Sequence, residues 1–396
     1  MRRRARVPRA RGGSARDGIV RVHRARNSHL RRACDDPRWS ARRDRRHCRP
    51  GRRPVTAPLL VRACRRERVE RTPVWFMRQA GRCLADYREL RERFGILDIA
   101  RNPELSARVT AMPVDQLGVD AAVLYADIML PLDGMGVPFR IEPEIGPIIE
   151  RPVRTARDVD ALRVVAAEEA TPYLFESIRA LRASLPPDVA LIGFAGAPFT
   201  IASYLVEGRP SRDHARAKGM LAGEPALWDR LLGTLAEVIS RYLVAQVKAG
   251  VDVIQLFDSW AGVLSPVDYE RAVLPHSRRI FDAVASTGVP RIHFFTGNPE
   301  LLRLAARNCE AVSVDWRIGL AEAWRRIGDA RAIQGNLDPA ICLAPFPVVA
   351  ERTRAVLREA GRRRGHIFNL GHGVLPETDA DTLRRITALV REETAA

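Results

Sequence analysis

Lysine is almost absent from this chain of 396 residues, which holds two lysines, Lys218 and Lys248, beside 63 arginines. Lysine codons are rich in A and T whereas arginine codons can be rich in G and C, so this bias indicates a gene from a GC-rich genome. The chain also lacks a run of about eighteen apolar residues, which predicts no membrane-spanning helix. Its six cysteines form no CxxC pair and no Cys/His ligand spacing. We therefore expect free thiols in a reducing, cytoplasmic compartment.

Several sequence motifs that mark common enzyme classes are also missing. There is no GxGxxG, P-loop, GxSxG, HExxH or protein-kinase motif, and no set of residues at the ligand spacing of zinc. These absences predict a protein without a nucleotide cofactor or metal. Hydrophobic residues make up 46% of the chain and charged residues 28%, so a sizeable core can form and general disorder is excluded.

The positive charge is concentrated at the start of the chain. The formal net charge is +18, which would ordinarily suggest a partner such as nucleic acid. Residues 1–56 hold twenty arginines and four aspartates, a net charge of +16, and the remaining 340 residues have a net charge of +2. We divide the chain into a tail, 1–54, and a globular domain, 55–396, and predict that the tail is disordered because dense like charge prevents burial.

Three interpretations of the tail remain open: a mis-called start, a disordered basic arm and a transit peptide. Upstream DNA of a GC-rich genome, read in frame, yields Arg, Ala, Gly and Pro, which favours a true initiator at Val55 or Val61. A nucleic-acid arm usually mixes lysine with arginine, and a transit peptide is richer in serine and poorer in acidic residues. We accordingly expect neither a nucleic-acid partner nor a membrane partner.

From residue 55 onward, short apolar segments alternate with longer helical patterns. The eight strand candidates are Val74–Arg78, Ala121–Asp127, Val189–Ala195, Val251–Asp258, Arg291–Phe295, Ala311–Asp315, Ala332–Gln334 and His366–Leu370. Most are apolar on both faces, as is typical of parallel strands covered by helices. Eight such units predict a (β/α)8 TIM barrel. The doubly wound alternative needs a glycine-rich phosphate turn after the first strand, and WFMRQAGR does not supply one.

The helical segments and one long connection complete the predicted architecture. Pro225–Lys248 shows the clearest helical period and is followed by Gly250, a residue typical of a helix end. Amphipathic helices are also predicted at Pro347–Ala360 and Thr378–Glu393. The connection 131–187 between the second and third strands is extended. We expect it to contain a small β excursion near 141–153 and extra helix over 157–184.

Polar side chains follow several predicted strands at their carboxyl ends, where the functional face of a barrel lies. This rule selects Arg78, Gln79, Arg82, Asp127, Thr200, Tyr204, Ser259 and His372. Two arginines in one RQxGR turn suit carboxylate or phosphate groups, because guanidinium binds both in bidentate fashion. The pattern predicts a barrel enzyme that acts on an anionic substrate.

Each of these residues also has a structural interpretation. The arginines could form surface ion pairs, and Asp127 could cap a nearby helix. Tyr204 lies in a helical stretch, where a core tyrosine is the usual case. His372 stands between two glycines and is more often a hydrogen-bond donor than a metal ligand in such a loop. Asp258 and Asp315 also end strands, and the pattern does not rank them.

Six longer motifs resemble the uroporphyrinogen decarboxylase family. They are RTPVWFMRQAGRCLADYRELR (71–91), LYADIML (124–130), GFAGAPFTIASYLVEG (193–208), LFDSWAG (256–262), QGNLDP (334–339) and FNLGHGVLPET (368–378). The resemblance covers residues 57–393 in the family's order and spacing, and the tail has no counterpart in it. Cys83 stands where the family usually has tyrosine, which changes a neighbour of the site rather than a named functional residue.

The resemblance implies a (β/α)8 barrel that forms a homodimer and needs no cofactor. It implies the substrate uroporphyrinogen III, a cyclic tetrapyrrole with eight carboxylates. The four acetate arms would lose CO2 and become methyl groups, which gives coproporphyrinogen III. A protonated pyrrole would serve as the electron sink of this reaction.

The resemblance also implies roles for individual residues. It places Arg78, Gln79, Ala80, Gly81 and Arg82 in the substrate-binding turn. Asp127 matches the aspartate that accepts hydrogen bonds from pyrrole N–H groups and stabilises the positive charge of a protonated pyrrole. Tyr204, Ser259 and His372 match further substrate contacts.

Two alternatives from other classes remain. Zinc-dependent methyltransferases that act on cobalamin or coenzyme M share the superfamily, but they carry a His-x-Cys pair and a later cysteine. The nearest match here, His293-Phe294-Phe295, lacks that cysteine. Nucleic-acid binding is suggested only by the charge of the tail.

Overall fold

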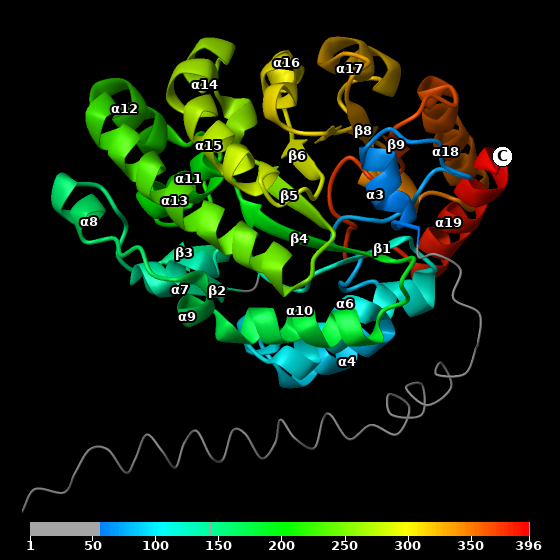
Figure 1. The fold of residues 1–396 in the computed structure, drawn as a ribbon, viewed down its shortest axis with the longest axis horizontal. Helices are drawn as coiled ribbons and strands as arrows, with labels where there is room; N and C mark the ends of the chain where they lie inside the picture. Colours follow the sequence, from blue (N-terminus) through cyan, green and yellow to red (C-terminus); the bar gives the residue numbers. More distant parts are fainter. Residues whose placement is uncertain (1–55, 143, 396) are drawn as a thin grey trace, which may run out of the picture. The chain divides into compact units, whose positions relative to one another are not determined.

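A curled parallel sheet lies at the centre of the domain. The structure is a computed structural model that describes residues 56–142 and 144–395 (Figure 1). The sheet has the strand order β1-β4-β5-β6-β7-β8-β9, with every neighbouring pair parallel. Its strands are β1 (Ala121–Val123), β4 (Ala190–Gly196), β5 (Val253–Asp258), β6 (Arg291–Phe295), β7 (Ala311–Ser313), β8 (Ala332–Gln334) and β9 (His366–Ile367). The predicted tail, 1–54, lies outside the described residues.

The segment around Val74 closes the barrel between the two outer strands. Val74 forms a parallel bridge with Phe368, just after β9, and its carbonyl accepts a hydrogen bond from Asp120 N, just before β1, at 2.8 Å. The prediction of a strand over Val74–Arg78 was wrong in extent, because a turn begins at once: Gln79 N bonds to Phe76 O at 2.9 Å. The TIM-barrel prediction is confirmed: in the described chain, seven strands form the barrel sheet and the Val74–Phe368 bridge takes the eighth position.

Three strands end earlier than predicted, and beyond two of them, β1 and β9, a side chain accepts a backbone hydrogen bond. β1 ends at Val123 rather than Asp127, and Tyr125 N bonds to Thr110 Oγ1 at 2.8 Å. β9 ends at Ile367 rather than Leu370, where Leu370 N bonds to the Asn369 side chain at 2.8 Å. β7 stops at Ser313, two residues short of the prediction, whereas β6 and β8 match their predicted bounds.

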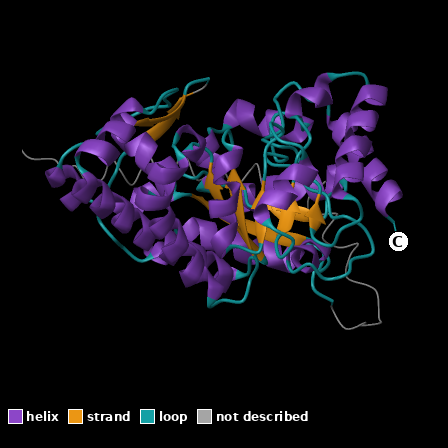
Figure 2. Ribbon diagram, turned by 90° about the horizontal axis from the view of Figure 1, so that it is seen from above, coloured by secondary structure: helices purple, strands orange, loops and turns teal. Residues whose placement is uncertain are grey.

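Helices surround the sheet, as both ribbon views show (Figures 1 and 2). The α-helices are α3 (Leu59–Cys64), α4 (Ala85–Arg93), α5 (Ile96–Ala100), α6 (Pro103–Leu117), α7 (Pro131–Met135), α8 (Ala156–Asp160), α9 (Ala167–Ala170), α10 (Pro172–Ser184), α11 (Pro198–Glu207), α12 (Ala215–Gly223), α13 (Pro225–Ala249), α14 (Pro266–Ala272), α15 (Leu274–Ala285), α16 (Leu302–Ala305), α17 (Leu320–Ile327), α18 (Phe346–Ala360) and α19 (Ala380–Thr394). Short 3-10 helices are η1 (Ala261–Val263), η2 (Pro299–Leu301), η3 (Ala306–Asn308) and η4 (Pro339–Leu343).

Helix α13 shows why the helical predictions succeeded. Proline occupies its first turn, where a missing N–H costs nothing, and Gly250 ends it with a φ of 123°. Its leucines line the buried face that packs on the sheet. The predicted helices at 347–360 and 378–393 appear as α18 and α19, each within two residues of the predicted bounds.

The long connection after β1 contains the predicted additions. β2 (Phe139–Glu142) and β3 (Gly146–Ile149) form an antiparallel pair, and α8, α9 and α10 follow. Ile149 N bonds to Gly208 O at 2.8 Å, which ties the β2–β3 pair to the end of α11. No helix in the described part of the chain is long and apolar enough to cross a membrane.

Polar side chains fill part of the barrel interior. The Trp75 indole donates to Gln334 Oε1 at 2.9 Å, and Gln334 Nε2 donates to Gln255 at 3.1 Å and to Ser313 at 2.8 Å. All four residues are buried. Because β5 and β8 are not neighbours, a bond between their side chains has to cross the inside of the barrel. This network joins the bridging segment to three strands directly below the turn that carries Arg78.

Candidate active site

The turn at Arg78–Arg82 is held by bonds to its own backbone and to β1. Gln79 is fully buried, accepts a hydrogen bond from Phe76 N at 2.9 Å and donates one to Ala121 O at 2.8 Å. A Cβ at Gly81 would lie 2.6 Å from the Arg78 carbonyl oxygen, so only glycine fits there. Gln79 and Gly81 thus shape the turn, and the predicted contacts of Gln79, Ala80 and Gly81 with substrate stay predictions.

Two arginine side chains at this turn are free to bind an anion. Arg78 and Arg82 are both exposed, and no carboxylate among residues 56–142 and 144–395 lies within ion-pair distance of either guanidinium. Arg78 adopts a left-handed backbone with a φ of 61°, a conformation that costs energy for a residue with a side chain. The structural interpretation, a surface ion pair, therefore finds no support within the described chain.

Asp127 lies in the loop after β1, close enough to Arg78 to feel its charge. Burial raises the pKa of the Asp127 carboxyl, and the backbone N–H of Met129 and the Arg78 guanidinium lower it. Met129 N donates to Asp127 Oδ1 at 2.8 Å, which fixes the orientation of the carboxylate. A partly exposed carboxylate that is held by one backbone bond keeps its second oxygen available for a ligand.

His372 lies in a loop that packs between two other segments. A Cβ at Gly373 would lie 2.5 Å from Arg78 Cδ, and a Cβ at Gly371 would lie 2.6 Å from Trp316 N. Gly371 is therefore required for close packing against the Trp316 backbone, whereas a side chain at Gly373 would displace the flexible Arg78 side chain. Burial, followed by the positive charge of Arg78, lowers the pKa of His372 to about 4. The imidazole is neutral near pH 7 and can donate one hydrogen bond and accept another.

Tyr204 reaches the same region from α11. Burial raises the pKa of its phenol, which also senses the charges of Asp127 and Arg78. Its ring packs edge-on against Trp260 with the centroids 6.3 Å apart. Ser259, beside Trp260 at the end of β5, accepts a hydrogen bond from Thr296 Oγ1 through its backbone oxygen at 2.7 Å.

The structure thus brings four of the predicted residues together, namely Arg78, Asp127, Tyr204 and His372. The charge of Arg78 acts on the other three. The two aspartates that the pattern did not rank hold loops in place. Buried Asp258 accepts from Thr200 Oγ1 at 3.1 Å, and buried Asp315 accepts from Gly297 N at 2.7 Å.

Trp316 and Arg317 also lie at this face and were missed by the sequence reasoning. Arg317 contributes to the lowered pKa of His372, and its guanidinium stacks on the Trp316 ring at 4.4 Å. Both residues follow Asp315, a strand end that the sequence reasoning had noted. The same rule, extended two residues further along the chain, would have selected them.

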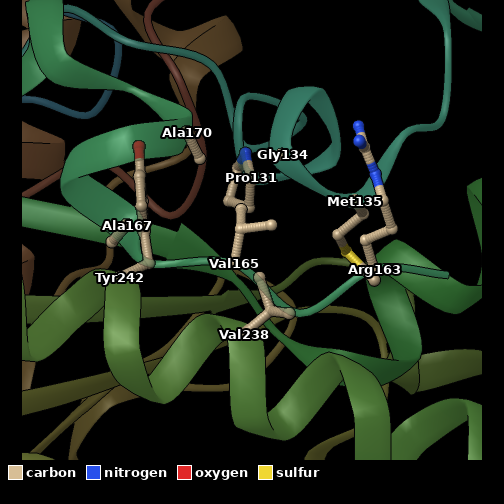
Figure 3. Close-up of a pocket in the computed structure, with 9 residues that line it drawn as sticks. All are labelled: Pro131, Gly134, Met135, Arg163, Val165, Ala167, Ala170, Val238 and Tyr242. Atoms are coloured by element: carbon tan, nitrogen blue, oxygen red, sulfur yellow. The ribbon is translucent and has the colours of Figure 1, made fainter.

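A separate depression lies among α7, α9 and α13 (Figure 3). It is lined by Pro131, Gly134, Met135, Arg163, Val165, Ala167, Ala170, Val238 and Tyr242. It contains none of the predicted site residues and is largely apolar. In the described chain, no group of three or more His, Cys, Asp or Glu side chains is arranged to hold a metal ion.

Comparison with known proteins gives the family. The model of the uroporphyrinogen decarboxylase (URO-D) family matches residues 56–393. The chain belongs to the uroporphyrinogen decarboxylase family. It is 53% identical over 337 residues to the uroporphyrinogen decarboxylase of Streptomyces griseus, covering 85% of this chain and 92% of that one. Identity to the enzyme of the same name from Thermus thermophilus is 50%, covering 85% and 98%.

A solved structure confirms the fold independently. A methyltransferase from Methanosarcina mazei superposes with a TM-score of 0.72 at 22% identity, covering 85% of this chain and 99% of that one. At this identity the similarity concerns the fold alone. The uroporphyrinogen decarboxylase family shares that fold and supplies the chemistry, which is decarboxylation in tetrapyrrole biosynthesis.

Proposed function

We propose that this chain decarboxylates the four acetate side chains of uroporphyrinogen III, giving coproporphyrinogen III and four CO2. Membership of the family supports the reaction class. The observation that carries the assignment to the barrel mouth is that Asp127, a carboxylate with a free oxygen, lies close enough to Arg78 to feel its charge, while the Arg78 guanidinium has no ion-pair partner among the described residues. The substrate presents the matching groups, pyrrole N–H donors at its centre and carboxylates at its edge.

Substrate binding falls to the arginines. Arg78 and Arg82 are exposed and have no carboxylate partner among the described residues. A guanidinium binds a carboxylate through two parallel N–H bonds, which gives orientation as well as affinity. The two arginines would hold carboxylate arms while Asp127 accepts hydrogen bonds from the pyrrole N–H groups.

Asp127 then stabilises the charge that develops during reaction. Protonation of a pyrrole ring carbon produces a cation, and the bond between the arm's CH2 and its carboxylate breaks as the electron pair moves into the ring. CO2 leaves, the exocyclic CH2 takes up a proton to become methyl, and the ring carbon loses its proton. A fixed anion in a partly desolvated site stabilises such a cation better than water does.

Tyr204 and His372 would complete the site as neutral hydrogen-bonding groups. Burial raises the pKa of Tyr204 and lowers that of His372 to about 4, so neither carries charge near pH 7. Neutral groups leave the balance between Asp127 and the arginines intact. We also propose that Ser259 contacts substrate, as the resemblance implies. The resemblance further implies a homodimer, and analytical ultracentrifugation would measure the oligomeric state.

The reaction is tested by anaerobic incubation with uroporphyrinogen III, oxidation of the products and chromatography by number of carboxylates. We expect products with seven, six, five and four carboxylates to appear in succession. Unchanged octacarboxylate would refute the proposal. Metal analysis of the same preparation tests the alternative, since stoichiometric zinc would support a methyltransferase.

A further inference from the structure

Arg317 is an exposed cation held in place by a buried acid. It lies two residues after Asp315, beyond the carboxyl end of β7. The Arg317 side chain is 49% exposed whereas that of Asp315 is 5% exposed. The pair is therefore asymmetric, with the carboxylate inside the protein and the guanidinium at its surface.

One backbone bond and two side-chain contacts hold Arg317. Asp315 Oδ1 accepts from Arg317 N at 3.0 Å, and Asp315 Oδ2 accepts from Arg317 Nη1 at 2.5 Å. The guanidinium stacks on the neighbouring Trp316 ring at 4.4 Å. Because the side chain is already ordered, a ligand that binds it loses less conformational entropy than it would with a free arginine.

The guanidinium keeps unused donors. Among residues 56–142 and 144–395, Arg317 Nε and Nη2 form no hydrogen bond, and Asp315 is the one carboxylate within ion-pair distance. Asp315 itself is already bonded to the backbone N–H of Gly297 at 2.7 Å. The acid thus has other partners, while the outer edge of the guanidinium faces solvent.

The loop that carries His372 packs against both the Arg78 side chain and the Trp316–Arg317 segment. Gly373 packs against the Arg78 stem, and Gly371 packs against Trp316, the residue that stacks with Arg317. The charges of both arginines reach the His372 imidazole. Arg78 and the Asp315–Arg317 pair therefore both lie close enough to His372 for their charges to act on its imidazole.

We propose that Arg317 is a third substrate-binding arginine, which holds a carboxylate arm of the tetrapyrrole beside the loop that carries His372. The inference rests on the proposed function, because the ligand is the same substrate. A cyclic tetrapyrrole with carboxylates around its whole edge offers arms to anchors that come from more than one segment of the protein. Arg78 and Arg82 come from one turn, and Arg317 supplies an anchor from the end of another strand.

The test compares Arg317→Gln with Arg307→Gln in the full-length enzyme. Arg307 is a matched control. It lies in η3, its side chain is 50% exposed, and it pairs with Glu270 at 2.6 Å. We expect Arg317→Gln to raise the KM for uroporphyrinogen III about tenfold with a small change in kcat, since a charge-assisted hydrogen bond is lost. Arg307→Gln should leave both constants unchanged, and Arg317→Lys should restore part of the affinity.

The outcomes separate this inference from the proposed function. Inactive wild-type enzyme would refute the proposed function, whereas active wild type with an unchanged KM in Arg317→Gln would overturn only the role of Arg317. If Arg317→Gln does not fold, the KM of Arg317→Lys decides in its place, because a bidentate contact does not survive that change. Inhibition by the product coproporphyrinogen III shows which kind of carboxylate arm Arg317 binds, because the propionates are the only carboxylates left in that product. Weaker inhibition of Arg317→Gln indicates a propionate, and equal inhibition with a raised KM indicates an acetate.

Discussion

The two ends of the barrel use arginine in opposite ways. At the amino ends of the strands, arginines pair with acids that stand one residue before a strand. Asp120, Asp252 and Glu310 precede β1, β5 and β7 in this way. At the carboxyl ends, Arg78 and Arg82 have no acidic partner in the described chain. Arg317, which also follows the carboxyl end of a strand, pairs with Asp315 but leaves Nε and Nη2 without a hydrogen bond in the described residues. An abundant residue type therefore marks function where some of its hydrogen-bond donors are left unused.

The amino-terminal pairs share one geometry. Each carboxylate binds a guanidinium and also accepts a backbone N–H from an adjoining segment. Asp120 binds Arg71 at 2.7 Å and accepts from Val74 N at 2.8 Å. Asp252 binds Arg182 at 2.7 Å and accepts from Leu191 N at 2.7 Å, and Glu310 bonds to both the side chain and the backbone of Arg291. These acids join neighbouring strands, which is a structural role.

The largest expected effect belongs to Asp127 at the carboxyl end. Asp127→Asn should lower kcat by a factor of about 10² to 10³, because an amide does not stabilise a developing cation. The melting temperature should change little, since asparagine can still accept the Met129 N–H bond. Steady-state kinetics and thermal unfolding measure the two effects. Asp282→Asn, at an exposed acid on α15, is the control, and near-wild-type turnover of Asp127→Asn would remove the residue from the mechanism.

Asp120 provides the opposite case at the amino end. Asp120→Ala leaves Arg71 and Arg391 without their acid and Val74 N without its acceptor. We expect a loss of about 3 kcal/mol in the free energy of unfolding, because a largely buried pair is broken. The KM of the folded enzyme should stay at its wild-type value. Chemical denaturation measures the loss, and a changed KM with unchanged stability would reverse the assigned roles of the two ends.

Arg78 should show an effect on binding without an effect on stability. Arg78→Ala should raise KM about tenfold or more through the loss of a charge-assisted contact. Alanine and arginine both carry a Cβ, so the left-handed backbone at this position costs about the same in both. Thermal unfolding should therefore match wild type. An unchanged KM would argue against the proposed carboxylate contact.

The fold was predictable from local patterns, but the strand ends were not. Apolar runs and first-turn prolines identified the βα units, and α13 and β6 matched closely. The errors lie where hydrogen bonds to side chains replace the backbone hydrogen bonds between strands. Thr110 and Asn369 capture backbone N–H groups near the ends of β1 and β9, and a side chain's distant partner leaves no local periodicity in the sequence.

For the site, residue types after strand ends predicted which side chains meet, but not what each one does. Arg78, Asp127 and His372 do lie together. Gln79 satisfies the same rule, yet its buried side-chain amide accepts a hydrogen bond from Phe76 N and donates one to the Ala121 carbonyl. Whether a polar group is free or already bonded depends on contacts across the fold, which spacing along the chain does not report.

The two histidines of the β9 region extend the comparison to pH. His366 begins β9 and His372 follows its carboxyl end, and burial lowers the pKa of each to about 4. His372 should therefore cause no step in the activity profile between pH 6 and 8. A pH profile of kcat/KM measures this, and a step that disappears in His372→Gln would contradict it.

His366 should instead affect stability, and the effect is the smallest of the set. Its folded pKa lies below the unfolded value of about 6.5, so the unfolded state binds the proton first as pH falls. The stabilisation is complete above about pH 6.5 and is lost progressively toward pH 4. From pH 6.5 to 5.5, wild type should lose about 1 kcal/mol more in free energy of unfolding than His366→Gln. The glutamine amide can still donate to Gly335 O, the partner of His366 Nε2 at 3.1 Å. Chemical denaturation at both pH values measures the difference, and equal losses would show that His366 is already charged, or never charged, in both states.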